Sequence, residues 1–304
     1  MMDYKDFIKN RELRLKILNF LSFIPDKCML KLLFKISMHQ NLNLSAPVGF
    51  NQKLQWLKLY DRNPLHTTLV DKYKVRDFVK ERIGEKYLIP LLGKWDSYSD
   101  ICFDKLPSKF VLKCNHDSGS IKIILDKNTI NHKELKAFFD TRLKSNPYTY
   151  GREWPYKGVK PCIIAEQYMG NDNGELPVDY KFFCFDGYVD SVMVCIGRGT
   201  PNKRFLFFDK NWHFKKYDKS CQELPDNFKM EKPSQIDRLF ELASHLSRGE
   251  QFVRIDFYII NEHIYFGEFT FYPGSGFDNE LMPLADSHFG SLIKTNNCDK
   301  TFVD

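Results

Sequence analysis

The sequence predicts an α+β fold preceded by a helical extension, and three observations lead to this prediction. Short runs rich in β-branched and aromatic residues recur from residue 87 to residue 270, which is typical of strands. Segments with helical spacing of apolar residues separate some of these runs. Other runs follow one another across tight turns such as Asp186-Gly187, which favours hairpins. Hairpins mixed with helices indicate α+β lobes.

The first 40 residues predict two amphipathic helices. Helical spacing runs from residue 5 to about residue 37 and is interrupted by Pro25-Asp26. Eight Lys or Arg residues stand against four acids between residues 1 and 40. One interpretation is that both helices pack on the main body. The alternative is that they form a surface for membrane lipid or for a partner protein.

The remaining elements follow in order along the chain. We expect helices at 50–60 and 69–83, the second ending before Gly84, and further helices at 131–144 and 234–247. We expect strands at the following ranges: 87–92, 110–115, 121–125, 161–167, 180–185, 188–196 and 205–208. The last helix leads into a hairpin that begins at Val253.

Composition narrows the class of protein. The chain has 304 residues, 43% hydrophobic and 28% charged, as in ordinary soluble globular proteins. Its eight cysteines form no CxxC, and most lie in apolar runs, which is typical of reduced thiols in a cytosolic protein. No apolar run approaches the ~20 residues of a membrane span. We therefore expect a cytoplasmic protein, with peripheral membrane contact left open.

The net charge indicates which kinds of ligand the protein binds. The charge of +6 is modest, and no basic stripe is interleaved with aromatic residues, so we expect no nucleic acid. A small anionic ligand explains the excess equally well. Cys114 and His116 lack a second pair of ligands, and they do not predict a zinc site.

The segment VRIDFYIINEHIYFGEFTFYPGSG, residues 253–276, carries polar residues in an otherwise apolar hairpin. A three-residue loop at 261–263 would pair Ile260 with Ile264. Asp256 would then lie opposite Glu268, and Arg254 opposite Thr270, with Cβ atoms roughly 5 Å apart.

Two carboxylates at that distance repel each other. A divalent cation between them would remove the repulsion, because Mg²⁺ prefers hard oxygen ligands completed by water and phosphate. The alternative is a solvated hairpin face on which Arg254 neutralises both acids. A two-residue loop would instead place Asp256 and Glu268 on opposite faces.

Four further stretches carry polar groups at strand ends. In FVLKCNHDSGSIKII, Lys113 lies in an apolar strand before a glycine loop whose N–H groups and hydroxyls suit a phosphate. In PCIIAEQYMG, an apolar strand runs into Glu166, Gln167 and Tyr168, where backbone groups can pair with an adenine edge and Asp172 or a neighbour can meet the ribose. In PVDYKFFCFDGYVDSVMVC, Asp179 and Lys181 share one strand face. In IGRGTPNKRF, two arginines flank a Gly/Pro loop. For each stretch taken alone, an ordinary loop or a solvated surface is the competing interpretation.

The order of these motifs resembles the ATP-grasp superfamily, and more closely its TupA-like group. The segments FNQKLQWLKLYDRNP, VDKYKVRDFV, FVLKCNHDSGS, DYKFFCFDG and FGEFTFYPGSGF carry the resemblance, which covers about Phe50 to Gly290. It implies an ATP-grasp fold, in which two α+β lobes clasp ATP. The implied division of the chain is an N-terminal helical extension at 1–48, an α/β segment at 49–110, a small lobe at 111–168 and a large lobe at 169–304.

The resemblance also implies roles for matching positions. Lys72 and Lys113 would hold ATP phosphates beneath a closing loop formed by His116, Ser118, Gly119 and Ser120 with Asp117. The adenine hinge would consist of Glu166, Gln167 and Tyr168. Asp179 and Lys181 would lie near the ribose and phosphates, Arg198 near the transferred phosphate, and Arg254 at the phosphate or the acid substrate. Lys181, Arg198 and Arg254 would be the catalytic residues. Mg²⁺ would bind Asp256, Glu268 and Thr270.

One position departs from the superfamily pattern. The residue two places after the metal-bridging glutamate is usually Asn, and here it is Thr270. A threonine hydroxyl reaches less far, which puts a second Mg²⁺ in doubt.

The activity that the resemblance implies is ATP-dependent carboxylate–amine ligation through an acyl phosphate. The setting of the TupA-like group suggests bacterial capsule, teichuronopeptide or O-antigen assembly, with a uronic acid or sugar and an amino acid as acid and amine substrates. The alternatives are a glycosyltransferase or phosphotransferase of the same pathways, and a nucleotide-binding module without catalysis. The Asp-x-Asp motif common in glycosyltransferases is missing from this sequence.

Overall fold

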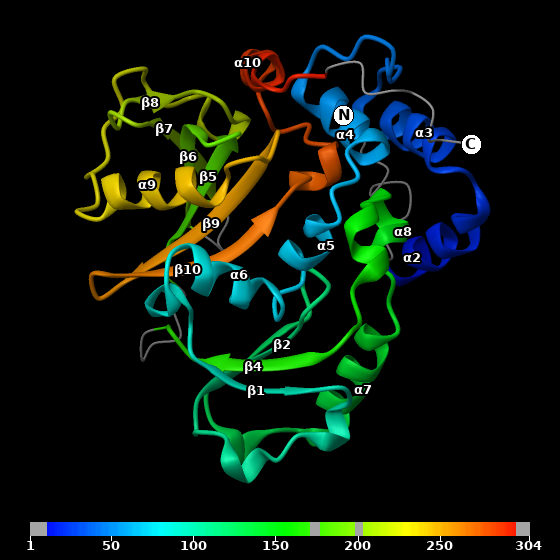
Figure 1. The fold of residues 1–304 in the computed structure, drawn as a ribbon, viewed down its shortest axis with the longest axis vertical. Coiled ribbons are helices and arrows are strands. Elements are labelled where there is room, and N and C mark those ends of the chain that lie inside the picture. Colours follow the sequence, from blue (N-terminus) through cyan, green and yellow to red (C-terminus); the bar gives the residue numbers. More distant parts are fainter. Residues whose placement is uncertain (1–10, 171–176, 198–202, 296–304) are drawn as a thin grey trace.

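Two antiparallel sheets facing each other form the body of the protein in the computed structural model, which describes residues 11–170, 177–197 and 203–295 (Figure 1). The smaller sheet has the order β1-β4-β2-β3, and the larger has the order β10-β9-β5-β6-β7-β8. The strands are β1 (Leu91–Trp95), β2 (Phe110–Cys114), β3 (Ile121–Ile124), β4 (Ile163–Gln167), β5 (Asp179–Phe185), β6 (Tyr188–Ile196), β7 (Arg204–Asp209), β8 (Phe214–Lys215), β9 (Val253–Ile260) and β10 (His263–Thr270).

Helices cover the outer faces and one end of the sheets. The described α-helices are α2 (Arg11–Phe20), α3 (Asp26–Met38), α4 (Phe50–Tyr60), α5 (Leu65–Leu69), α6 (Val75–Arg82), α7 (His132–Leu143), α8 (Tyr148–Gly151), α9 (Ile236–Leu246) and α10 (Pro283–Leu292). Short 3₁₀ turns include η1 (Leu21–Phe23), η2 (Glu85–Tyr87), η6 (Trp154–Gly158) and η8 (Pro273–Gly276). No helix in this described part of the chain is both long enough and apolar enough to cross a bilayer.

Alternation along the strands explains the two cores. In the small sheet, Phe110, Leu112 and Cys114 point to one face and pack toward α7, where Phe139 is buried. Helix α9 covers the outer face of the large sheet, where Phe240 contacts Phe182 edge to face at 5.1 Å. The polar residues lie on the opposite face of each sheet.

The other face of the large sheet is aromatic at one end and polar at the other. At one end, helices α4 and α10 cover it through a cluster of aromatic rings, in which Phe50 and Phe289 lie 5.5 Å apart. At the other end the same face carries Lys181, Arg254 and Asp256 toward the small sheet. The rigid aromatic end therefore positions the polar end.

Several expected elements differ from the structure. The helix expected at 69–83 begins only at Val75, as α6, and residues 70–74 link it to the short helix α5, which was not predicted. The strand expected at 87–92 lies at Leu91–Trp95, because residues 85–87 form a 3₁₀ turn. Strand β8 and helices α8 and α10 were not predicted.

The expected α/β segment at 49–110 is not a separate layer. Its β1 pairs with β4 in the small sheet, and its α4 packs on α10. We keep the four-part division of the chain as a proposal, with β1 assigned to the small lobe.

Candidate active site

The β9–β10 hairpin turns over two residues, not the three we expected. Ile260 pairs with His263, and the turn residues Asn261 and Glu262 have φ angles of 49° and 63°. Two successive residues with positive φ are the signature of a type I′ turn, whose twist matches that of the flanking strands. The expected pairing of Ile260 with Ile264 is therefore wrong.

A β-bulge at Gly267 restores the expected pairing further along. The register shifts between Phe266 and Glu268, so that Asp256 lies opposite Glu268. One extra residue in one strand reverses the parity that the two-residue turn had set. A Cβ atom at Gly267 would lie 3.0 Å from the backbone oxygen of Asp256, so glycine permits the close approach of the two strands.

Arg254 links the polar residues of the hairpin. Its Nε and Nη2 each donate to an oxygen of Asp256 at 2.7 Å. The same Nη2 donates to Thr270 at 3.0 Å and lies 3.5 Å from Glu268. The arginine thus lies between both acids, which is the geometry of our alternative interpretation. The face is not solvated, however, because the Arg254 side chain is only 13% exposed.

Lys181 supplies a second cation to Asp256 from the neighbouring strand β5. Its Nζ lies 2.5 Å from Asp256 and 3.4 Å from Asp179. Burial favours the neutral form of Asp256, but the charges of Arg254 and Lys181 outweigh it and lower the pKa of this carboxyl. The Asp256 carboxylate is therefore held by two cations.

Glu268 is the open carboxylate of the pair, with 38% of its side chain exposed. Its nearest further cation is Lys72, at 3.8 Å. We expected Lys72 to lie on a helix, but it lies in the turn before α6. From there its Nζ also donates to the Asp117 carbonyl at 2.9 Å, which connects the hairpin to the glycine loop.

The glycine loop directs most of its side chains inward. His116, Asp117 and Ser120 are buried, and the Ser120 hydroxyl donates to the Asp117 carboxylate. Burial lowers the pKa of His116, so this imidazole is neutral near pH 7. Ser118 and Gly119 alone form the exposed tip of this loop, where Gly119 has a φ of 96°. The tip therefore presents one hydroxyl and backbone N–H groups.

Lys113 has a carboxylate partner on the small sheet. Its Nζ lies 2.6 Å from Glu166 of β4, and Arg76 of α6 lies 3.5 Å from the other oxygen of that carboxylate. The side chain of Glu166 is thus held by two cations. Arg76 was missed in the sequence, because an arginine on an amphipathic helix looks like a solvated residue.

A cavity of about 130 Å³ lies between the two sheets. Small-sheet residues and the segment after β4 form one wall, and two hairpin residues form the other. The lining residues are Ile89, Val111, Lys113, Ile121, Ile123, Glu166, Gln167, Tyr168, Met169, Gly170, Pro177, Tyr258 and Gly267. The apolar members could have been found by parity, because Val111, Ile121 and Ile123 share a sheet face with Lys113.

Asp172 and Arg198 fall outside the residues that the structure describes. The segment at 152–156 anchors the N-terminal helices and does not line the cavity. In it, the buried Arg152 donates to the carbonyl of Leu21 at 2.8 Å and to that of Ile24 at 3.1 Å.

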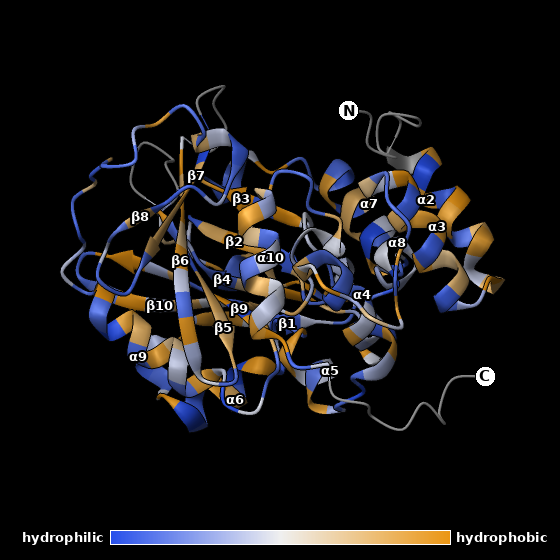
Figure 2. Cartoon of the chain, turned by 90° about the horizontal axis from the view of Figure 1, so that it is seen from above, coloured by the Kyte–Doolittle hydropathy of each residue, from blue (hydrophilic) through white to orange (hydrophobic). Residues whose placement is uncertain are grey.

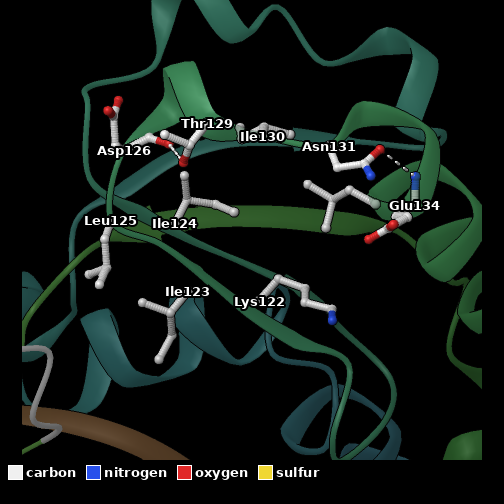
Figure 3. A pocket seen from close by; sticks show the side chains of 10 residues that line it. Lys122, Ile123, Ile124, Leu125, Asp126, Thr129, Ile130, Asn131 and Glu134 are labelled. Atoms are coloured by element: carbon white, nitrogen blue, oxygen red, sulfur yellow. Dashed lines mark hydrogen bonds between the residues drawn. The ribbon is translucent and has the colours of Figure 1, made fainter.

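A larger hollow of about 420 Å³ lies on the opposite face of the small sheet (Figure 3). Its polar groups are engaged in local structure. Asn131 caps α7 by accepting from Glu134 N, and the Thr129 hydroxyl donates to the Asp126 carbonyl. The remaining surface is largely aliphatic, and this hollow shares only Ile123 with the cavity between the sheets.

The donor chemistry of the hairpin fits Mg²⁺. Phosphate-linked Mg²⁺ is usually held by one or two carboxylates and completed by water and phosphate. Asp256 and Glu268 supply these two carboxylates on one face. Across the described residues there is no cluster of three or more His, Cys, Asp and Glu side chains placed to hold a metal. The hairpin thus offers part of a coordination shell, which water and phosphate would complete.

The chain belongs to the TupA-like ATPgrasp family, because the model of that family matches residues 52–294. The family confirms the ATP-grasp fold that the motif order had indicated. A comparison with curated proteins found no match.

Solved structures of ligases are also similar. D-alanine–D-alanine ligase from Bacillus anthracis has a TM-score of 0.45 and 16% identity, over 74% of this chain and 66% of that chain. A structure of the same enzyme complexed with ATP gives 0.43 and 16%, over 74% and 62%. D-alanine–D-alanine ligase from Helicobacter pylori gives 0.42 and 13%, over 81% and 69%. The chain spans slightly less than two thirds of the length of the first two.

Proposed function

We propose that this protein is an ATP-dependent carboxylate–amine ligase that forms an amide through an acyl phosphate. The observation that carries the proposal is the opposed pair Asp256 and Glu268, surrounded by three cations and adjoining a cavity between two sheets. Phosphoryl transfer needs little covalent chemistry from a protein and depends on positioning and on charge. This arrangement supplies both.

The cavity suits a nucleotide base. Its apolar wall, formed by Val111, Ile121 and Ile123, would pack against adenine, and the segment from Glu166 to Tyr168 would offer backbone groups to its edge. Lys113, at the inner end of this wall, would reach the phosphates. A site of this kind, mostly apolar with a few placed polar groups, is typical of cofactor pockets.

The phosphates would lie between the glycine loop and the hairpin. Lys72 contacts both of these regions, so a bound triphosphate would replace the protein carbonyl as the partner of its ammonium group. The tip at Ser118 and Gly119 would close over the phosphates and exclude water, which would otherwise hydrolyse an acyl phosphate. Asp179 and Lys181 would lie near the ribose and phosphates, and we keep Asp172 and Arg198 as proposed ligands.

In the proposed reaction, a substrate carboxylate attacks the γ-phosphate and an amine then displaces phosphate from the acyl group. Lys181 and Arg254 stabilise the charge that develops on the transferred phosphoryl group. Asp256, Glu268 and Thr270 would hold Mg²⁺, which neutralises phosphate charge when bound. Glu268 is the ligand free to approach it, because Asp256 is held by two cations.

The substrates that we propose follow from the resemblance to the TupA-like group. They are a uronic acid or sugar acid and an amino acid, joined during assembly of bacterial capsule, teichuronopeptide or O-antigen. The positive net charge of +6 is consistent with acidic substrates.

The test is release of ADP with a panel of acids and amines, with mass spectrometry of the products. An amide product that requires both an acid and an amine supports the ligase. Transfer of phosphate to a sugar hydroxyl without an acid indicates the phosphotransferase alternative instead. Binding of ATP without turnover on any acceptor indicates a non-catalytic module. Either of the last two outcomes would overturn the proposal.

A further inference from the structure

Helix α2, near the N-terminus, carries apolar side chains that are exposed to solvent. Leu13, Ile17 and Phe20 recur at helical spacing along one face of α2. Phe20 is 76% exposed and Phe23 is 74% exposed, and the two rings contact each other edge to face at 6.2 Å. Figure 2 places α2 and α3 together at one end of the molecule. We call these four residues the apolar tip.

The apolar tip is held rigidly on the body. Arg152 donates to three backbone carbonyls of residues 21–24 and contacts Asp26 at the start of α3. Thr149 of α8 donates to Asn19 of α2 at 2.5 Å. Large aromatic side chains are thus presented to solvent by an anchored helix and not by a loose end. Exposed apolar side chains that lie together on the surface, as these do, favour an interaction site over the single exposed residues of an ordinary surface.

A basic pocket lies on the flank of the same helix. The pocket of about 580 Å³ is formed by α2, α7, α8 and the residues that follow α7. Its cations are Lys16, Arg142 and Lys144, and Asn19, Thr141, Ser145 and Tyr150 add polar groups. On a helical projection Lys16 lies between the apolar tip and the pocket, at about 60° from Leu13. The exposed apolar side chains of the apolar tip therefore lie next to a pocket whose cations suit a phosphate group.

Positive charge continues over the neighbouring helix. Lys27, Lys31 and Lys35 of α3 are exposed, and Leu32 is exposed between them. Between residues 13 and 39 the sole acid is Asp26, and its carboxylate is already held by Arg152 and by the Tyr148 hydroxyl. The charge is complementary to an anionic surface.

We propose that α2 and α3 dock the protein on an anionic phospholipid bilayer. The apolar tip enters the boundary between headgroups and acyl chains, and a lipid phosphate occupies the pocket of Lys16 and Lys144. An amphipathic helix with lysines beside aromatic residues lies in the plane of the interface in this way. The inference does not depend on the proposed ligase activity, because it requires neither ATP nor turnover.

The test is flotation of the full chain with vesicles of phosphatidylcholine, with and without an equal part of phosphatidylglycerol. We expect the protein to float with the anionic vesicles at low salt and to be released at high salt. The double variant Lys16→Gln/Lys144→Gln should bind about tenfold or more weakly, because each basic residue near such a surface contributes about fivefold. Arg142 is left unchanged because it contacts Asp117 of the glycine loop.

A second double variant, Phe20→Ser/Phe23→Ser, should lose binding while keeping its thermal midpoint, since both rings are exposed. The matched controls are Leu284→Ser, exposed on α10, and Lys210→Gln/Lys229→Gln, exposed on the large lobe. They should float as the unaltered protein does. Equal binding to neutral and anionic vesicles, or no binding to either, would contradict the proposal. So would a solution dimer that the Phe20→Ser/Phe23→Ser variant converts to monomer.

Discussion

Two of the regions in which the protein buries charge differ in what their charged groups contact. In the hairpin cluster of Lys72, Lys181, Arg254, Asp256 and Glu268, cations contact carboxylates and one carboxylate stays partly exposed. In the second region, Lys58 donates to the carbonyls of Gly151 and Ser275 at 2.6 and 2.7 Å. The first region adjoins a cavity, whereas Lys58 is 1% exposed.

The comparison shows that burial of charge alone does not identify a functional site. Lys58 and Arg152 each donate to backbone carbonyls, so Lys58 connects α4 to α8 and η8, and Arg152 connects the end of α8 to η1. The hairpin cluster holds its charges beside a cavity, where a ligand can exchange with the internal partners. A functional role is favoured where a buried charge has a partner that a ligand can replace.

The largest effect is expected for Glu268→Gln. This change removes one negative charge and little volume, so the fold should persist. Turnover should fall by about 10²–10³, the typical cost of losing one strong electrostatic contact in a transition state. Steady-state ADP release measures it. The matched control is Glu250→Gln, a buried carboxylate 2.5 Å from His66, which should lower the melting temperature and leave turnover per folded molecule unchanged.

Next in size is the loss of stability in Lys58→Met. The change leaves the Gly151 carbonyl and the Gln55 side-chain oxygen without their donor, whereas the Ser275 carbonyl keeps Gln55 Nε2. Each buried acceptor left unsatisfied typically costs about 1–3 kcal/mol. Urea denaturation monitored by fluorescence measures the free energy of unfolding. Lys53→Met on the same helix is the control, since Lys53 is less buried and contacts one carbonyl. Equal losses in the two variants would contradict the account of the second region.

A smaller effect is expected for Gly267→Ala, which tests the bulge. The new methyl group would lie 3.0 Å from a backbone oxygen and 3.1 Å from the Tyr258 ring. Relief of this overlap should cost about 1–3 kcal/mol of stability and shift Glu268 relative to Asp256, so that affinity for ATP falls. Gly158→Ala is the control. Its methyl group would lie 3.0 Å from the end of the Thr67 side chain, and affinity for ATP should not change.

The hairpin shows how far the sequence predicts this site. Side-chain parity correctly placed Asp256 opposite Glu268, but the loop length behind that prediction was wrong, and the bulge at Gly267 compensated for it. Neither feature could be predicted, because residues 261–263 are compatible with both loop lengths and a glycine in a strand does not by itself specify a bulge.

The contacts between distant segments were the least predictable part of the site. Lys113 is paired with Glu166, which lies on a strand 53 residues later in the sequence. Arg76 and the second region around Lys58 depend on packing between helices and loops, which carries no local signal. The strands and the long helices were predicted better, because their periodic apolar patterns are local.

The smallest expected effect is a dependence of stability on acid pH. The pKa of Asp256 is lowered from its ordinary value of 3.8, so the native state binds fewer protons than the unfolded state at acid pH. Its contribution is therefore complete at pH values above about 4 and is lost as the pH falls below that value. Asp256→Asn should flatten the fall of the melting temperature below about pH 4, whereas Asp237→Asn, on an exposed side chain, should not.

The central claim is that the hairpin cluster and the adjoining cavity form one site for ATP and Mg²⁺. Isothermal titration calorimetry of ATP binding, with and without Mg²⁺, tests it directly in the unaltered protein, in Glu268→Gln and in Glu250→Gln. We predict that Mg²⁺ strengthens ATP binding in the unaltered protein and in Glu250→Gln, and that this strengthening is largely lost in Glu268→Gln. No ATP binding by the unaltered protein, or the same strengthening by Mg²⁺ in all three, would contradict the claim.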